Sequence, residues 1–317
     1  MAQDQIRISP RPEVDFASDG YEYVRYSESG DRLSVSCGGT AANFSKKHGA
    51  VTSLVMNGVN VFSTQLPSMP GGPRLTYSRA LVDNDKWLMW PFIHSGLKIT
   101  KYHPEPIEIV SNGVKVVNRI TGLKSAMFIH EAVYEFSKDG SVIVRNTVKP
   151  RGCMPPQLPR LGLSMRLDPS LEKMRYFGRG PWENYIDRNS GAFFGIWNST
   201  VTEQYEPYVR PQDNGYKSDV RWVQFLDEKN RGIKFESDVP LFMQALHVEE
   251  DDLHQARHIN GEPKKYRKLE FQDDIFLKLD ARQCGLGGSS CGPQPLKKYL
   301  FNPNENVVWT LRISPVK

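Results

Sequence analysis

The sequence predicts an all-β protein, a sandwich or barrel of many antiparallel strands. Three observations predict this class. Apolar residues alternate with polar ones in many segments, turn dipeptides separate these segments, and no window of a dozen residues carries an apolar stripe of helical period. Strands joined by short turns form two-layer folds, because a sheet with one apolar face must bury that face against another layer.

Four segments show the alternation most clearly. In a strand, residues two apart lie on the same face, so the apolar residues of each segment should point into the core. These residues are Leu33, Val35 and Cys37; Leu161, Leu163, Met165 and Leu167; Ile275, Leu277 and Leu279; and Val307, Trp309, Leu311 and Ile313.

Dipeptides that tolerate positive φ mark the turns between strands. They are Asp19-Gly20, Asn57-Gly58, Asn112-Gly113, Asp139-Gly140, Asn214-Gly215 and Asn260-Gly261. Residues 132–148 fit a hairpin with its turn at 138–141. The best helical candidate, residues 170–175, is one or two turns long.

One large β domain is the economical interpretation of the whole chain. Residues 1–22 are polar with two prolines and fit a tail or an inter-domain segment, which leaves residues 23–317 as the domain. The stretches 67–73 and 149–159 are expected to be long loops, because strand patterns continue on both sides of each.

Composition excludes several functional classes. The 317 residues are 39% hydrophobic and 24% charged, which is typical of a globular protein. The net charge of +5 is spread along the chain, so no nucleic-acid partner is expected. No apolar run approaches the ~20 residues that span a bilayer, so no membrane partner is expected either. No signal-peptide pattern is found, and the cytoplasm and the periplasm both remain open.

Cysteine and histidine patterns point to no disulfide scaffold and no metal. The four cysteines favour free thiols, although Cys284 and Cys291 are close enough in sequence to bridge a Gly-rich loop. His247, His254 and His258 flank the acidic run 249–252, but their spacing fits no zinc motif, and such a run is usually solvated. We therefore predict no metal and no cofactor in this chain.

Aromatic and polar residues are mixed in three stretches, residues 78–90, 176–188 and 205–222. Sugar sites pair aromatic faces with hydrogen-bonding side chains, so this mixture favours a carbohydrate site. The alternative is a set of paired charges buried between two sheets. Residue types alone leave both open for Arg179, Glu183, Asp187, Arg188 and Arg221.

Two of these stretches carry a family resemblance. YFGRGPWENYIDR at 176–188, followed by YEPYVRPQDNGYKSDVRW at 205–222, resembles the signature of the C-terminal domain of bacterial β-galactosidases of glycoside hydrolase family 2. ANFSKKHGAVTSLVMNG resembles that domain's opening hairpin, RALVDND its Arg-Ala-Pro-x-Asp-Asn-Asp element, and DARQCGLGGSSCGP its Gly-rich loop. The resemblance covers residues 23–317 and implies a large antiparallel super-sandwich related to galactose mutarotases.

The resemblance also implies a partner. Family 2 hydrolysis uses an acid/base glutamate and a nucleophilic glutamate on a (β/α)₈ barrel, and retaining hydrolysis needs two carboxyls about 5–5.5 Å apart. No part of this sequence alternates strands with helices. We therefore expect the chain to pack on such a barrel, in cis or as a separate large chain, and to help shape its galactoside pocket without hydrolysing lactose alone. Mg or Na is expected only in the barrel.

The resemblance places the expected carbohydrate-binding residues in the quoted motifs. They are Arg79, Asp83, Asn84, Asp85, Arg179, Glu183, Asn184, Tyr185, Asp187, Arg188, Asn214, Asp219, Arg221, Ser290 and Cys291. In the family the Gly-rich loop carries a tryptophan that closes over the substrate. Cys291 stands at that position here, and a thiol supplies no aromatic platform.

The runner-up interpretation is a stand-alone aldose mutarotase or epimerase of the same fold, acting on galactose-type sugars. Mutarotation needs a base for the anomeric hydroxyl and an acid for the ring oxygen. His247 with Glu183 or Asp219 would supply that pair. A free-standing carbohydrate-binding module fits the aromatic residues but not the length of the chain.

Overall fold

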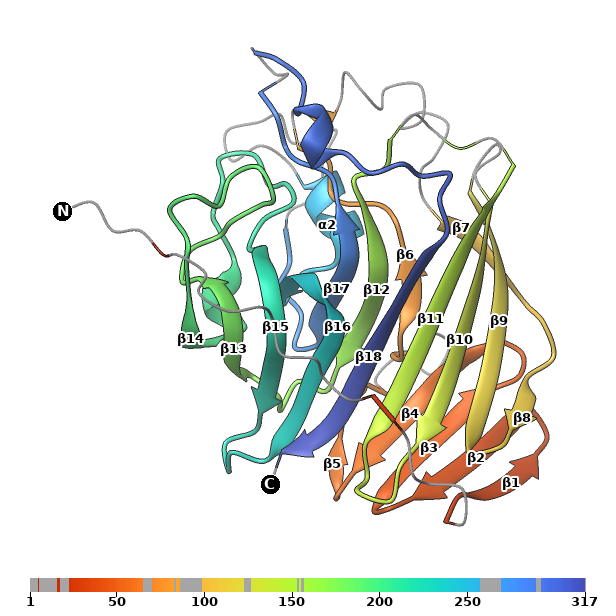
Figure 1. Ribbon diagram of the computed structural model, residues 1–317. Helices are drawn as coiled ribbons and strands as arrows, with labels where there is room; N and C mark the ends of the chain where they lie inside the picture. Colours follow the sequence, from red (N-terminus) through yellow and green to blue (C-terminus); the bar gives the residue numbers. More distant parts are fainter. Residues whose placement is uncertain are drawn as a thin grey trace.

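Two antiparallel sheets make up nearly the whole fold (Figure 1). In this computed structural model the residues described are 5, 16–17, 23–64, 70–82, 84–85, 99–122, 127–152, 154, 157–256, 269–288 and 292–316. The predicted all-β class is confirmed.

The smaller sheet is a meander of five strands in the order β1-β2-β3-β4-β5. Asn57 and Gly58 both have positive φ and form the predicted turn between its last two strands. The strands are β1 (Arg25–Ser29), β2 (Arg32–Cys37), β3 (Thr40–Ser45), β4 (Ala50–Met56) and β5 (Val59–Asn60).

The larger sheet has thirteen strands, nine of them in the order β14-β13-β15-β16-β18-β11-β10-β9-β7. Its strands are β6 (Arg74–Thr76), β7 (Ile99–Pro104), β8 (Glu108–Val110), β9 (Gly113–Gly122), β10 (Met127–Phe136), β11 (Val142–Arg151), β12 (Arg160–Leu167), β13 (Lys173–Gly180), β14 (Phe193–Thr200), β15 (Lys217–Leu226), β16 (Gly232–Leu246), β17 (Ile275–Gln283) and β18 (Val307–Val316). The predicted hairpin is confirmed as β10 and β11.

The larger sheet branches at β16. Residues 232–237 of this strand pair with β18, whereas residues 242–246 pair with β17, which continues to β12 and β6. Strands β12 and β17 therefore lie on a side branch and not within the row of nine strands. Both are buried on both faces, so polar residues on them are enclosed together with the apolar ones.

The core lies between the two sheets, and every apolar residue predicted from the four alternating segments is buried in it. Ring contacts join the layers: Phe44 of β3 meets Tyr134 of β10 edge to face, with ring centroids 5.2 Å apart. Asn118 of β9 donates to the carbonyl of Gly49 at 2.8 Å, which fixes the two sheets against each other at this point.

Two local predictions are wrong. Residues 170–175 are not helical: Ser170 closes a turn on the carboxylate of Asp168, and β13 starts at Lys173, because Met174 is buried in an antiparallel pair with Phe225. The acidic run is not simply a solvated loop, since α2 (Glu250–Gln255) turns one of its carboxylates into the interior. The two short 3₁₀ turns are η1 (Thr202–Gln204) and η2 (Lys297–Tyr299).

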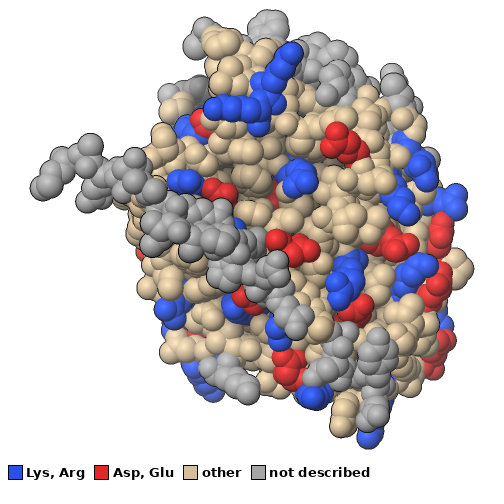
Figure 2. Space-filling view, in the orientation of Figure 1, with Lys and Arg blue, Asp and Glu red and all other residues tan. Residues whose placement is uncertain are grey.

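Three further predictions concern two turns, the distribution of surface charge and membrane crossing. The turns at Asp19-Gly20 and Asn260-Gly261 lie outside the residues described. Lys and Arg are interspersed with Asp and Glu over the face seen in Figure 2. Within the described part of the chain, no helix has both the length and the apolar character that a membrane crossing requires.

Candidate functional site

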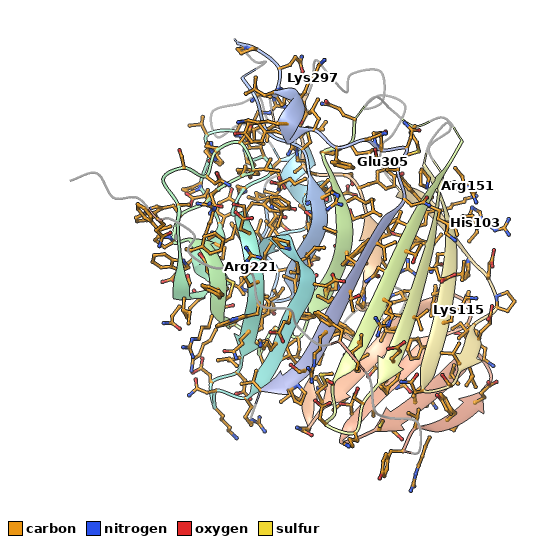
Figure 3. The ribbon with its side chains drawn as sticks, in the orientation of Figure 1. His103, Lys115, Arg151, Arg221, Lys297 and Glu305 are labelled. Carbon is orange, nitrogen blue, oxygen red and sulfur yellow. The ribbon has the colours of Figure 1, made fainter. Side chains whose placement is uncertain are left out.

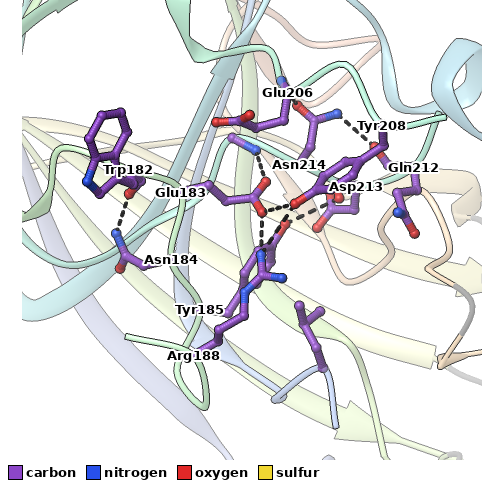
Figure 4. A network of polar contacts seen from close by, with 12 residues as sticks. Trp182, Glu183, Asn184, Tyr185, Arg188, Glu206, Tyr208, Gln212, Asp213 and Asn214 are labelled. Atoms are coloured by element: carbon purple, nitrogen blue, oxygen red, sulfur yellow. Dashed lines mark hydrogen bonds and ion pairs between the residues drawn. The ribbon is translucent and has the colours of Figure 1, made fainter. Parts of the chain in front are cut away.

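Loops from distant parts of the chain meet at one end of the sandwich and enclose a hollow of about 210 Å³ (Figure 4). We call this end the loop end. It is formed by residues 77–82, 84–85, 181–192, 205–216, 284–288 and 293–299, the last two joined by backbone hydrogen bonds. The polar lining of the hollow is Asn84, Glu183, Arg188, Tyr208, Gln212 and Asp213, and the apolar lining is Val82, Tyr185 and Leu286.

The loop that carries Glu183 leaves β13 through Gly180. A Cβ on Gly180 would lie 2.2 Å from the hydroxyl of Tyr176, so only glycine fits this close approach. The Gly180–Pro181 peptide is cis, and residues 182–188 follow outside the sheet.

Glu183 lies in the wall of the hollow and joins two loops. Its Oε1 accepts hydrogen bonds from Arg188 and, at 2.5 Å, from the hydroxyl of Tyr208. Its Oε2 accepts from the backbone N–H of Gly215 at 2.6 Å. Only 6% of the side chain is exposed. Both oxygens accept hydrogen bonds from groups of the protein, so Glu183 ties the 181–192 loop to Tyr208 and Gly215.

Asn184 and Asn214 hold backbone in the same way. The amide oxygen of Asn184 accepts from the N–H of Ser218 at 2.8 Å, and its NH₂ donates to the carbonyl of Trp182 at 2.9 Å. Asn214 accepts from the N–H of Glu206 at 3.0 Å. Both asparagines are fully enclosed, so their side chains face the protein and not a ligand.

Asp187 and Asn84 converge on the start of the Gly-rich loop. The Asp187 carboxylate accepts from the N–H groups of Leu286 at 3.0 Å and Gly287 at 2.8 Å. The side-chain amide of Asn84 donates to the carbonyl of Gly287 at 2.7 Å. Two predicted residues from distant motifs thus position one loop.

Arg79 and Asp85 form a buried bidentate ion pair beneath these loops. The Nε and Nη2 atoms of Arg79 donate to the two carboxylate oxygens at 2.9 and 2.6 Å. Both side chains are almost completely enclosed. The pair ties residue 79 to residue 85 and is enclosed, so it is not open to a sugar.

Arg179, Asp219 and Arg221 lie outside the hollow. Arg179 donates to Asp219 at 2.8 Å, and the guanidinium groups of Arg179 and Arg221 lie 5.0 and 5.5 Å from the ring centre of Phe194. Figure 3 places Arg221 on the sheet, away from the loop end where Lys297 lies. Asp83, Ser290 and Cys291 lie outside the described residues.

His247 is bonded to neither of its predicted partners. Its Nε2 lies 2.8 Å from a carboxylate oxygen of Glu172, and its Nδ1 lies 3.2 Å from the backbone oxygen of Asp274. Asp219 is paired with Arg179, and Glu183 is bonded as described above. The acid and base of the mutarotase interpretation are therefore not brought into contact.

A buried charge network below the hollow was missed by the sequence analysis. Arg160 contacts the Tyr216 hydroxyl and Glu250, and Lys278 donates to Glu250 at 2.7 Å. Tyr216 donates to Asp280 at 2.8 Å. The available signal was the presence of Lys278 and Asp280 between the apolar residues of β17, which a one-sided strand would expose to water.

Burial and charge oppose each other in this network. Burial raises the pKa of Asp280 to about 6, although Arg160 acts to lower it. Burial would also raise the pKa of Glu250, but Lys278 and Arg160 outweigh it and lower that pKa to about 2. Glu250 is therefore the fixed negative charge that holds both cations. Among the described residues, no group of three or more potential ligands is arranged to hold a metal ion.

We predict that Glu183→Gln lowers the free energy of unfolding by about 1–3 kcal/mol, the cost of leaving a buried donor unpaired. An amide has one acceptor oxygen, so it cannot serve both the Tyr208 side and the Gly215 side. Urea unfolding followed by tryptophan fluorescence measures the change. Glu206→Gln, whose carboxylate accepts no hydrogen bond from the described residues, is the control and should change stability by less than about 0.5 kcal/mol. Equal losses in both variants would contradict the role assigned to Glu183.

Comparison with known proteins places this geometry in a family. Residues 36–313 match the family model described as β-galactosidase small chain. The β-galactosidase of Priestia megaterium is 23% identical over an alignment that covers 100% of this chain and 30% of that protein. The β-galactosidase of Streptococcus thermophilus is 26% identical and is matched over 77% of this chain and 24% of its own length.

A third relative is also matched over a minority of its length. The β-galactosidase of Pseudoalteromonas haloplanktis is 33% identical over 56% of this chain and 16% of that protein. The chain thus spans less than a third of the length of these curated relatives. A solved galactose mutarotase-like protein from Lactobacillus casei superimposes on 90% of this chain with a TM-score of 0.49 and 10% identity.

Proposed function

This chain belongs to the β-galactosidase small chain family, and from that premise we propose that it is the carbohydrate-associated C-terminal domain of a β-galactosidase. In this role it docks on a catalytic (β/α)₈ barrel and shapes one wall of the barrel's galactoside pocket. The observation that carries the proposal is the match of residues 36–313 to the family, together with relatives more than three times as long. The barrel would lie on the same polypeptide or on a separate large chain, and any Mg or Na would belong to it.

The contacts of Glu183 at the loop end support a structural role for this chain and a catalytic role for such a barrel. Retaining hydrolysis needs one carboxyl as acid/base and another as nucleophile. At the hollow, both oxygens of Glu183 are committed to Arg188, Tyr208 and Gly215. This carboxylate therefore supports the loops, and the hydrolytic pair is assigned to the partner.

The loop end also exposes apolar side chains that suit a protein partner. Trp182 is 73% exposed, Val209 in the next loop is 58% exposed, and Leu296 is 62% exposed. Leu296 lies near the hollow, since Pro295 before it approaches Gly287. Tryptophan is enriched among the residues that dominate interface energies, so Trp182 is the first candidate for an anchor on a partner.

The experiment is a complementation assay with the Priestia megaterium β-galactosidase from which the matched region has been deleted. Its own excised region serves as the positive control. Adding this chain should restore hydrolysis of a chromogenic galactoside. We expect Trp182→Ala to reduce the restored rate at least ten-fold at limiting chain concentration, the effect of losing one interface anchor.

Ile109→Ala is the matched control for this assay. Ile109 is 48% exposed on β8, which Figure 1 shows at the opposite side of the fold from the loop end. This variant should restore hydrolysis as well as the unaltered chain. Restoration by the relative's own region, with no binding and no activity from this chain, would overturn the docking proposal.

A further inference from the structure

A residue near the N-terminus, Gln5, is hydrogen-bonded to the edge of the larger sheet. Its side-chain amide donates to the carbonyl of Phe194 on β14 at 2.9 Å and accepts from the N–H of the same residue at 2.5 Å. In an antiparallel sheet, a residue of a neighbouring strand makes the same two hydrogen bonds with its partner. Gln5 therefore occupies a place on β14 that a further strand would otherwise take.

Strand β14 lies at one end of the row of nine strands, and β13 is the only described strand that pairs with it. The outward N–H and C=O groups of such an edge strand are free to pair with another chain. At the far end of β14, side chains already bind these groups: the N–H of Thr200 donates to Glu203 at 3.0 Å, and its carbonyl accepts from Gln204 at 2.9 Å. Gln5 binds the outward groups of Phe194 in the same way.

A second contact of the N-terminal segment lies on β11. The carbonyl oxygen of Phe16 accepts from Nη2 of Arg145 at 2.9 Å. Arg145 points to the outer face of the sheet, because its neighbour Val144 points into the core. Phe16 is only 9% exposed, and Ile143, on the same strand face as Arg145, is 1% exposed. Both lie outside the apolar core clusters of the described chain, so we assign them to a small apolar contact on the outer face.

The two contacts lie on different halves of the larger sheet. Strand β14 belongs to the half that ends at β16, and β11 belongs to the half β11-β10-β9-β7; among the described strands, only β18 pairs with both halves. Five inter-strand steps separate β14 from β11, a distance of about 24 Å. Residues 6–15 link Gln5 to Phe16, and a chain of this length reaches up to about 36 Å. One short segment is therefore long enough to hold both halves.

We propose that the N-terminal segment is a clasp on the larger sheet, anchored by Gln5 at the β14 edge and by Phe16 on β11. Each anchor raises the local concentration of the other, because the link between them is short. The clasp closes the β14 edge to other strands and holds the two halves that meet at β18. It goes beyond the docking role, since both anchors and their partners lie within this chain.

The test is hydrogen exchange of the full chain, resolved to single amides. In Gln5→Ala the N–H of Phe194 loses its acceptor, and we expect it to exchange at least about ten-fold faster. Gln5→Glu keeps an acceptor oxygen for this N–H, so most of the protection should remain. Gln224→Ala is the matched control, because the side chain of Gln224 on β15 makes no hydrogen bond to the described residues and its loss should leave Phe194 unchanged.

A clasp also predicts coupling between its two anchors. Phe16→Ala removes the anchor on β11, yet it should speed exchange at Phe194 by about three-fold or more, because the segment is then held at one end only. Phe271→Ala is its control, since this phenylalanine is 56% exposed and its ring contact is with Tyr205. The buried amide of Val223 in β15 reports general loss of stability and should exchange at an unchanged rate in every variant.

Faster exchange at Phe194 in both Gln5→Ala and Phe16→Ala, with Val223 unchanged, supports the clasp. Unchanged exchange at Phe194 in Gln5→Ala would overturn it, because Gln5 would then not close the edge. An effect of Gln5→Ala without any effect of Phe16→Ala would also overturn it, because the two contacts would be independent. Equal acceleration at Phe194 and Val223 would have the same meaning, since it reports a loss of stability of the whole fold.

Discussion

Glu250→Gln should lower the free energy of unfolding by about 3–5 kcal/mol, the loss expected when a buried charge pair is broken from one side. Glu250 is the shared carboxylate of Arg160 and Lys278, and it also accepts from the hydroxyl of Ser78 at 2.7 Å. A neutral amide leaves two buried cations facing each other. Urea unfolding, with the slope checked for two-state behaviour, measures the change.

Two variants make this result specific. Glu249→Gln removes the adjacent carboxylate, which forms no ion pair within the described chain, and it should cost less than about 1 kcal/mol. The double variant Glu250→Gln/Lys278→Met removes one of the stranded cations, so it should recover part of the loss. A Glu250→Gln protein as stable as the Glu249→Gln protein would show that the network contributes no net stability.

Acidification should destabilise the protein through His130. Burial lowers the pKa of this imidazole to about 4, although a hydrogen bond with Asn146 acts in the opposite direction. In the unfolded chain the pKa is about 6.5, so between pH 6.5 and pH 4 the unfolded state binds more protons. The contribution of His130 to the free energy of unfolding is therefore fully present above pH 6.5. It is lost as the pH falls to 4, by about 3 kcal/mol in total.

The measurement is the difference between two curves. His130→Gln keeps a polar partner for Asn146 and removes the titration. Between pH 7 and pH 4.5, the unaltered protein should lose about 2–3 kcal/mol more than this variant. Asp280, whose pKa burial raises to about 6, acts in the opposite direction in the same pH range, but it is present in both proteins and cancels. Parallel curves would refute the assignment.

Much of the sheet structure follows from local pattern. The alternating residues of β2, β12, β17 and β18 are buried as predicted, because a strand with one apolar face has few other ways to remove it from water. The same rule failed for Lys278 and Asp280, which it would expose to water. They are enclosed because Tyr216 and α2 cover that face of β17. Burial by residues that are distant in the sequence does not show in the alternation of polar and apolar residues along a strand.

The site was predictable in composition but not in assembly. Glu183 and Arg188 lie five residues apart and do form a pair, but the pair lines the hollow with Arg188 half exposed and is not buried between the two sheets. The contacts of Asp187 and Asn84 with Gly287 join segments 100 and 203 residues apart, and no local pattern encodes them.

The position of β18 has a consequence for biosynthesis. This strand is made after all the others described, yet it lies in the middle of the larger sheet, pairing with β16 on one side and β11 on the other. No other described strand joins the β11-β10-β9-β7 half to the β16 half. During translation the two halves must wait as separate open-edged sheets until residues 307–316 leave the ribosome, and exposed edges of this kind are where nascent chains recruit chaperones or misassemble.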